Sequence, residues 1–355
     1  MIIDCAIHPF LDNSELRRRL PQPYAGLALP EFENQRYIPP GGWYAPGLAT
    51  SKGGDVEASA RQLFDQWGVD AAVLLPHARG LIESATHASA VARAINEWLA
   101  ETWIDAPAAQ GRLLGSIRVS TTDANAAVTE IERWAGHPAF VQVVVPLASN
   151  APYGRAQFFP IWECACRHGL PVAVLADGQL AMELPPTPVG YPSTFVELAT
   201  LQPMLTAMHV TSLFAEGVFD RLPGLLFVFA DGGFDQIRPI LWRLRKDWRA
   251  TRSELAARDD PMSYIQPHVR FVTGFADGPL DAQGLTAFTA IEHSDQLIMF
   301  GSHHPRWDVQ SPQEAFAGCP DELRDLLLGR NAAQIYGRGL ASTQPGRRAG
   351  GSDGR

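Results

Sequence analysis

The chain has 355 residues, of which 46% are hydrophobic and 19% charged, and its formal net charge is −9. This composition predicts a globular protein with a large core. The acidic balance argues against a nucleic-acid partner, since nucleic-acid-binding proteins carry a basic patch or stripe. The compact basic stretch RLRKDWR at 243–249 falls in a helical pattern and is interpreted as a solvated helix face.

Neither membrane insertion nor export is expected. The beginning, MIIDCAIHPF, lacks a charged segment followed by a long apolar one, and no apolar run approaches the length of a membrane span. We therefore predict a cytoplasmic protein with reduced thiols and no membrane partner. Cys164 and Cys166 stand one residue apart in a helical pattern and so point to different faces, and without a CxxC pair a zinc ribbon is not expected.

Short apolar runs alternate with longer amphipathic segments. The short runs are almost continuously apolar, which is typical of parallel strands buried on both faces. The expected strands are 2–8, 69–75, 112–119, 140–146, 171–176, 225–230, 269–273 and 296–302. The expected helices are 57–67, 83–104, 123–136, 156–168, 196–221, 234–256, 281–292 and 312–336.

This alternation predicts an α/β fold of the (β/α)8 TIM-barrel class, with residues 1–340 as a single domain. A doubly wound sheet is the alternative, but it usually has a glycine-rich turn after its first strand, where this chain has His-Pro-Phe. Residues 10–56 are rich in Pro, Gly and aromatic side chains and predict a lid-like insertion over the barrel mouth. Residues 179–195 predict a second irregular loop, and residues 341–355 a disordered tail.

Polar, titratable side chains stand where several predicted strands end. The chemistry of a TIM barrel collects at the carboxyl ends of its strands, so these side chains are candidates for one pocket. The candidates are His8, His77, Asp231 and His303. Because neighbouring residues of an extended chain point opposite ways, at most one of His303 and His304 faces the barrel axis, and His303 lies nearer the strand.

Further side chains are candidates for substrate binding. Arg79 and Arg155 follow the second and fourth predicted strands, and an arginine binds a carboxylate through two parallel hydrogen bonds. Arg306 and Asp308 follow the histidine pair and are expected to form a salt bridge across the mouth or a structural contact. The remaining candidates, which include aromatic residues able to line a pocket for an apolar or aromatic substrate, are His77, His304, Trp43, Tyr44 and Phe195.

Several stretches, in order along the chain, resemble the amidohydrolase-related TIM barrels of the aminocarboxymuconate-semialdehyde decarboxylase type (amidohydrolase family 2). The matching stretches are IIDCAIHP (2–9), ARAINEWLAETW (92–103), residues 140–174, residues 216–248, HVRFVTGF (268–275) and LIMFGSHHPRWD (297–308). The resemblance implies a TIM barrel, a small-molecule substrate and a homodimer.

The chain departs from this family at the metal site that the resemblance implies. The family carries His or Asp, one residue, then His after strand 1, and this chain has Ala6 and His8. Leu175 replaces the His of strand 5, and Asp231 stands where members carry His or Glu. His303 replaces the Asp after strand 8. Alanine and leucine offer no metal ligand, so the inherited site is expected to be broken.

Three interpretations follow, and the first is favoured. The chain is an enzyme without a metal cofactor, in which His8, Asp231 and His303 perform acid–base chemistry (lyase, hydrolase, or cyclisation and rearrangement) on a small carboxylated or aromatic metabolite, in specialised biosynthesis. In the alternative, the same three residues hold one divalent Zn, Mn or Fe ion in a rearranged hydrolase or decarboxylase site. In the third, the protein is a non-catalytic pseudoenzyme that binds a metabolite or a partner.

Overall fold

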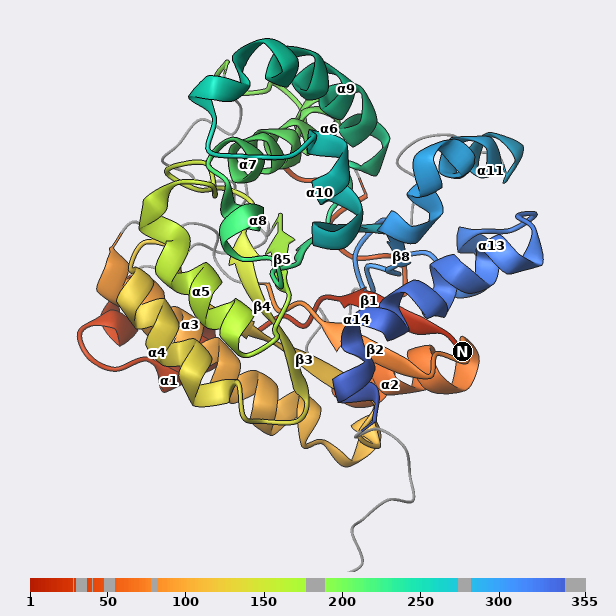
Figure 1. The fold of residues 1–355 in the computed structure, drawn as a ribbon. Helices are drawn as coiled ribbons and strands as arrows, with labels where there is room; N and C mark the ends of the chain where they lie inside the picture. Colours follow the sequence, from red (N-terminus) through yellow and green to blue (C-terminus); the bar gives the residue numbers. More distant parts are fainter. Residues whose placement is uncertain are drawn as a thin grey trace, which may run out of the picture.

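The structure is a computed structural model that describes residues 1–27, 29, 37–39, 41–47, 55–77, 82, 84–176, 189–273 and 282–341. Its centre is one eight-stranded sheet in which every strand is parallel to the next, in the order β1 to β8 (Figure 1). The strands are β1 (Ile3–Ile7), β2 (Ala71–Leu74), β3 (Leu113–Arg118), β4 (Phe140–Pro146), β5 (Val172–Leu175), β6 (Phe227–Phe229), β7 (Val269–Thr273) and β8 (Ile298–Phe300).

The sheet curves until β8 and the residues after it lie beside β1. The Ser302 N–H donates to Oδ1 of Asp4 at 2.9 Å, and the His8 N–H donates to the carbonyl of His304 at 2.8 Å. A Cβ added at Gly301 would lie 2.7 Å from the Cβ of Ala6, so only glycine allows this approach. The predicted TIM-barrel fold is confirmed, and the doubly wound alternative is wrong.

Each strand sends alternate side chains into the barrel and out against the helices, as the two-residue period of a strand requires. The inner set is a separate apolar cluster whose members include Val73, Leu75, Leu114, Val144, Ala173, Leu175, Val228, Val272 and Met299. Tyr336 of α14 (Asn331–Leu340) belongs to the same cluster, and its hydroxyl donates to Oε1 of Gln142 at 2.8 Å. The interior is thus a packed core, and α14 packs against it.

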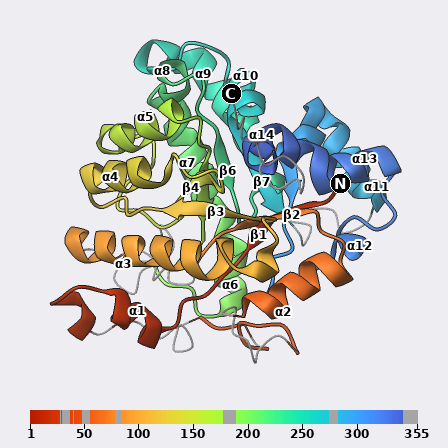
Figure 2. The ribbon, with the colours of Figure 1, turned by 90° about the horizontal axis from the view of Figure 1, so that it is seen from below.

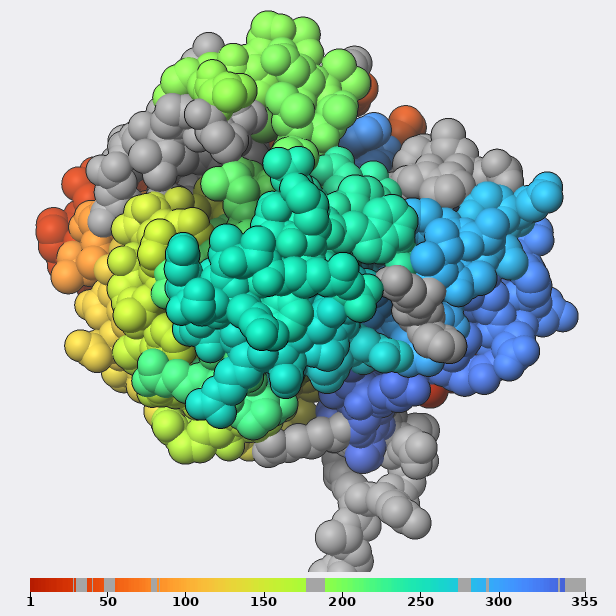
Figure 3. Space-filling view, turned by 45° about the horizontal axis from the view of Figure 1, so that its top comes forward, coloured from red at the N-terminus to blue at the C-terminus, as the bar shows by residue number. Residues whose placement is uncertain are grey.

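Helices surround the sheet (Figures 1 and 2). In chain order they are α1 (Asn13–Arg19), α2 (Val56–Ala60), α3 (Ala85–Trp98), α4 (Ala124–Trp134), α5 (Phe159–Arg167), α6 (Phe195–Leu201), α7 (Pro203–Ala215), α8 (Val218–Arg221), α9 (Phe234–Thr251), α10 (Pro261–His268), α11 (Ala282–Ala290), α12 (Pro312–Ala315), α13 (Asp321–Asp325) and α14. Three continue as wider π-helical turns, over Arg61–Gln66, Leu99–Ile104 and Leu326–Arg330. The helices after β5 and β6 form a continuous face, from α6 (green) to α10 (teal) (Figure 3).

The observed helices differ from the expected ones in several places: residues 316–320 interrupt the segment 312–336, and α10 was not expected. The segment 196–221 divides into α6, α7 and α8, because Pro203 lacks the N–H that would continue α6 and Gly217 adopts a φ of 65° before α8. The segment 10–56, predicted as a lid-like insertion, contains α1. Asp12 caps α1, and its carboxylate accepts from the N–H groups of Ser14 and Glu15.

Parts of the two predicted loops lie against the segment that follows β8. Tyr44 and Arg306 form an antiparallel bridge, and the Trp307 N–H donates to the carbonyl of Trp43 at 2.8 Å. The expected lid therefore touches the barrel mouth at these residues, whereas its role as a lid remains a prediction. Residues 177–188 and 342–355 lie outside the described residues. Across the described chain, no helix combines the length and the apolar character that crossing a membrane requires.

Candidate active site

Two histidines from opposite ends of the chain meet where β1 and β8 end. His8 Nε2 lies 3.0 Å from His303 Nδ1, which is hydrogen-bonding distance. His8 Nδ1 is 3.3 Å from the carbonyl of Leu75, and the two imidazole planes are inclined by 12°. The relative exposures of His8 and His303 are 1% and 5%, so this pair is held almost entirely away from solvent.

The backbone around His303 is unusual, and side chains hold it in place. His303 has a φ of 57°, in the left-handed region that a non-glycine residue seldom adopts. Before it, Oδ1 of Asp4 accepts from the N–H groups of Ala6 and Ser302, and the Ser302 hydroxyl accepts from the His304 N–H. This network turns the chain so that His303 contacts His8.

His304 takes the other direction, as the sequence predicts for one of the two neighbours. Its ring packs edge-on against Trp67, with 6.0 Å between the ring centroids. Neither ring nitrogen has a hydrogen-bond partner among the described residues, and burial lowers the pKa of His304 from 6.5 to about 4. The His304 ring is therefore neutral, packs against Trp67 and points away from the His8–His303 pair, although the His304 carbonyl accepts from the His8 N–H.

His77 and Arg118 extend the cluster along β2 and β3. The ring of His77 lies 4.8 Å from that of His8, centroid to centroid. Leu74 of β2 is paired with Gly115 of β3. His77 and Arg118 each follow three residues later, so they lie at the same height along the barrel axis. Arg118 is 3% exposed and follows the inward-facing Leu114 at a spacing of four, which places its side chain inside the barrel.

Arg118 was not predicted from the sequence, because it lies inside the third predicted strand (112–119) and the candidates were polar groups that follow a strand. The available signal was polar residues at alternate positions, Ser116 and Arg118, in an otherwise apolar strand. Asn96 of α3 fixes this position from outside the barrel. Its amide oxygen accepts from the Arg118 N–H at 2.7 Å, and its amide nitrogen donates to the Arg118 carbonyl at 2.8 Å.

Arg306 forms a buried ion triad with two aspartates. Its guanidinium binds both carboxylate oxygens of Asp308, at 3.0 and 2.8 Å, which confirms the predicted salt bridge. A third N–H donates to Oδ1 of Asp231 at 2.5 Å, while Oδ2 of Asp231 accepts from the Ala176 N–H at 2.8 Å. Both oxygens of Asp231 are thus engaged, and the triad ties the end of β6 to the segment after β8.

This environment keeps the imidazoles neutral. Burial, then the neighbouring His77 and Arg306, hold the pKa of His8 well below its ordinary value of 6.5. Burial and then Arg306 lower the pKa of His303, against the opposing effect of Asp308 and Asp231. A neutral imidazole has one donor and one acceptor nitrogen, so the short contact joins a donor on one ring to an acceptor on the other.

Aromatic residues from both predicted loops meet beside the triad. The ring of Phe195 lies edge-on to Trp43 at 6.0 Å and to Trp307 at 5.6 Å, measured between centroids. Tyr44 joins this region through its bridge to Arg306. Arg155 does not join it, because its exposed side chain pairs with Glu216 at 2.7 Å. Arg79 lies outside the described residues.

The barrel-mouth residues do not fit a metal ion. Ala6 and Leu175 are fully buried and offer no donor, and Arg306 and a backbone N–H already occupy the oxygens of Asp231. Arg306 also brings a cation close enough to lower the pKa of both His8 and His303. The described residues do contain one group of three potential metal ligands whose donor atoms lie within 4.8 Å of one another. It lies away from the barrel mouth, on α4 and at α5.

An eight-stranded parallel barrel with titratable side chains at the carboxyl ends of its strands is the architecture of TIM-barrel enzymes. A family model described as "Amidohydrolase" matches residues 3–338. The chain therefore belongs to this family, amidohydrolase family 2, and the resemblance drawn from the sequence is confirmed.

Curated relatives include two gamma-resorcylate decarboxylases. The protein from Rhodococcus jostii (strain RHA1) is 25% identical over 303 residues, 79% of this chain and 88% of its own length. The protein from Polaromonas sp. (strain JS666 / ATCC BAA-500) is 25% identical over 241 residues, which span 62% of this chain and 69% of that protein.

Solved structures agree on the fold. An amidohydrolase from Mycobacterium avium subsp. paratuberculosis K-10 superposes with a TM-score of 0.74 at 18% identity, covering 94% of this chain and 98% of that one. A dihydroxybenzoic acid decarboxylase from Polaromonas sp. JS666, with bound manganese and the inhibitor 2-nitroresorcinol, gives a TM-score of 0.68 at 20% identity, covering 95% and 97%.

Proposed function

We propose that this protein is a lyase that removes the carboxyl group of a small hydroxylated aromatic acid, with His8 and His303 as its acid–base pair. The observation that carries the proposal is the short contact between these two buried imidazoles. The substrate class follows the curated relatives, which act on gamma-resorcylate. The aromatic side chains of Trp43, Phe195 and Trp307 are of the kind that packs against such a ring.

In the proposed reaction a proton is added to the ring carbon that bears the carboxylate. The bond from this carbon to the carboxylate then breaks, its electron pair returns to the ring, and carbon dioxide leaves. One aromatic carboxylate and one proton thus give one arene and one carbon dioxide. With His8 Nδ1 donating to the Leu75 carbonyl, His8 Nε2 accepts from His303 Nδ1, so the neutral pair has no spare proton. The pair therefore first takes up one proton from solvent on His303 Nε2, and this nitrogen passes it to the ring carbon. The lowered pKa of His303 makes its charged form a stronger acid.

Arg118 is the proposed partner of the substrate carboxylate. Its side chain lies inside the barrel, level with His77, and brings a fixed positive charge to the strand ends where the histidines meet. A guanidinium binds a carboxylate through two parallel hydrogen bonds, which fixes orientation as well as charge. Arg306 is a poorer candidate for this role, because three of its N–H groups already bind Asp231 and Asp308.

The relatives favour the alternative, a metal-dependent decarboxylase, over the metal-free interpretation, since one is known with bound manganese. In that second candidate His8, Asp231 and His303 hold the ion, and Arg306 must release Asp231 to allow it. The buried triad and the apolar Ala6 and Leu175 argue against this rearrangement. Homodimer formation, expected from the resemblance, remains a proposal.

Substitution of the pair tests the proposal against the non-catalytic alternative. His303→Asn keeps a residue that tolerates the left-handed backbone, and His8→Gln keeps a polar side chain of similar reach. With a panel of hydroxybenzoates, each variant is expected to lose about 100-fold or more in turnover, the usual contribution of general acid–base catalysis. His137→Gln, at the turn before β4, is the matched control. A wild-type protein that binds these acids but never releases carbon dioxide would instead support a pseudoenzyme.

A further inference from the structure

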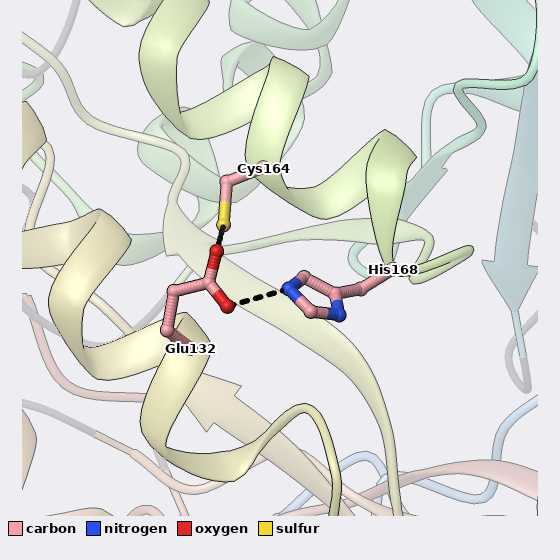
Figure 4. Close-up of side chains that lie close together, drawn as sticks. All are labelled: Glu132, Cys164 and His168. Carbon is pink, nitrogen blue, oxygen red and sulfur yellow. Dashed lines mark hydrogen bonds and ion pairs between the residues drawn. The ribbon is translucent and has the colours of Figure 1, made fainter.

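Three ligating side chains gather on the outer surface of the barrel, between α4 and α5 (Figure 4). The Cys164 thiol contacts Oε1 of Glu132 at 3.5 Å, and His168 Nε2 lies 2.8 Å from Oε2 of the same carboxylate. All three donor atoms lie within 4.8 Å of one another. The proposed acid–base chemistry uses none of these residues.

The three side chains come together because α4 and α5 pack side by side. Cys164 and His168 are four residues apart, so they lie on the same face of α5 and its C-terminal end. Glu132 extends from α4, which packs alongside, and its contacts join the two helices. The sequence pattern predicts a helix that contains Cys164 and His168 but does not indicate that Glu132, in another helix, lies opposite them.

We propose that Glu132, Cys164 and His168 form a zinc site, with water as the fourth ligand, that joins α4 to α5. Thiolate, imidazole and carboxylate are the ligands that zinc takes in proteins. A tetrahedral ion with bonds of about 2.0–2.3 Å has ligand atoms about 3.3–3.8 Å apart. Cys164 Sγ and Oε1 of Glu132 are already this far apart. His168 Nε2 contacts the other oxygen, Oε2, at 2.8 Å, so the imidazole or the carboxylate must shift for one carboxylate oxygen and both other ligand atoms to surround the ion.

The charges of the site also suit a divalent cation. A carboxylate and a thiolate together neutralise Zn²⁺, and the thiol proton is released to solvent as the bond to sulfur forms. Arg167 now neutralises Glu132, at 2.5 Å from Oε1, and its side chain is 59% exposed, so it can turn away into water. The exposed carboxylate of Glu132 and the partly exposed imidazole of His168 leave a path for the ion from solvent.

A cobalt titration tests this site without reference to catalysis. Protein purified without a metal-affinity tag and stripped by chelator is titrated with Co²⁺, and absorption from a cobalt–thiolate bond is followed in the near ultraviolet. We expect this absorption to saturate at about one ion per chain, and added Zn²⁺ to abolish it. Glu132→Gln is expected to weaken binding at least tenfold, and Arg167→Met to tighten it.

Two cysteine variants make the test decisive. Cys164→Ser is expected to lose the thiolate absorption, and Cys166→Ser, on another face of the same helix, to keep it. Thermal unfolding of both variants shows that each is folded, and the exposed Glu132 gives a second variant with little risk to the core. The proposal is overturned if no cobalt–thiolate absorption arises, or if it survives Cys164→Ser. The cobalt–thiolate absorption reports only on a site that contains a cysteine, and the His8–His303 pair contains none. A negative result would therefore rule out the zinc site without bearing on the proposed lyase.

Discussion

At the scale of single residues, the position of His303 depends on its backbone. The left-handed φ of 57° costs about 1–2 kcal/mol for a residue with a Cβ, and the hydrogen bonds from Asp4 and Ser302 compensate for it. The sequence shows the two adjacent histidines but not this backbone conformation, because it depends on contacts between Asp4 and Ser302, far apart in the chain.

This strain gives a prediction about stability. His303→Gly and His303→Ala both remove the imidazole, but only glycine adopts the left-handed region without a penalty. We expect the glycine variant to be more stable than the alanine variant by about 1 kcal/mol in urea denaturation. Equal stability of the two variants would mean that His303 is not held in this conformation.

The ion triad gives a second prediction at this scale. Arg306→Met leaves two mostly buried aspartates without their cation, and breaking a buried pair costs about 3–5 kcal/mol. Arg306→Lys retains the charge but not the paired N–H groups, so an intermediate loss is expected. Denaturation at pH 7 measures both variants. A loss below about 1 kcal/mol for Arg306→Met would show that the triad behaves as an exposed pair.

At the scale of elements, the apolar runs located all eight strands, because a strand buried on both faces is apolar throughout. Short helices were harder to predict. The pattern merged α6, α7 and α8 into one helix and missed α1 and α10. A helix of only two turns shows too few apolar repeats to be distinguished from an irregular loop. His8, His77 and His303 were found because each follows a strand, whereas Arg118 was missed inside one.

His209 links two elements and predicts a pH dependence. Its Nδ1 accepts from the Tyr153 N–H and its Nε2 reaches the Leu147 carbonyl, so α7 holds the segment after β4 through a neutral imidazole. Burial lowers its pKa from 6.5 to about 4. Between these values the unfolded chain binds a proton that the folded chain does not, so stability falls as pH drops through this range.

The contribution of His209 amounts to roughly 3 kcal/mol between the two pKa values, as an upper estimate. Chemical denaturation from pH 7 to pH 4 is expected to show a shallower loss of stability in His209→Gln than in the wild type. Parallel slopes for the two proteins would place the acid sensitivity in other groups.

At the scale of the whole molecule, family membership and local chemistry point in different directions. The match over residues 3–338 establishes the fold and the family, and curated relatives are decarboxylases. The residues at the barrel mouth nevertheless offer few metal ligands. Ala6 and Leu175 stand at two of the positions where the resemblance implies a ligand, and Asp231 is paired with Arg306. The proposed chemistry therefore rests on the His8–His303 pair.

The measurement that tests this claim most directly is carbon dioxide release from hydroxybenzoates, 2,6-dihydroxybenzoate first, by chelator-treated Cys164→Ser protein, with and without added Mn²⁺. This variant removes the proposed zinc site on α5, so a response to metal reports on the barrel mouth. The account predicts release without metal, unchanged by Mn²⁺ and lost in His8→Gln. Release that appears only when Mn²⁺ is added would contradict it and establish the metal-dependent alternative.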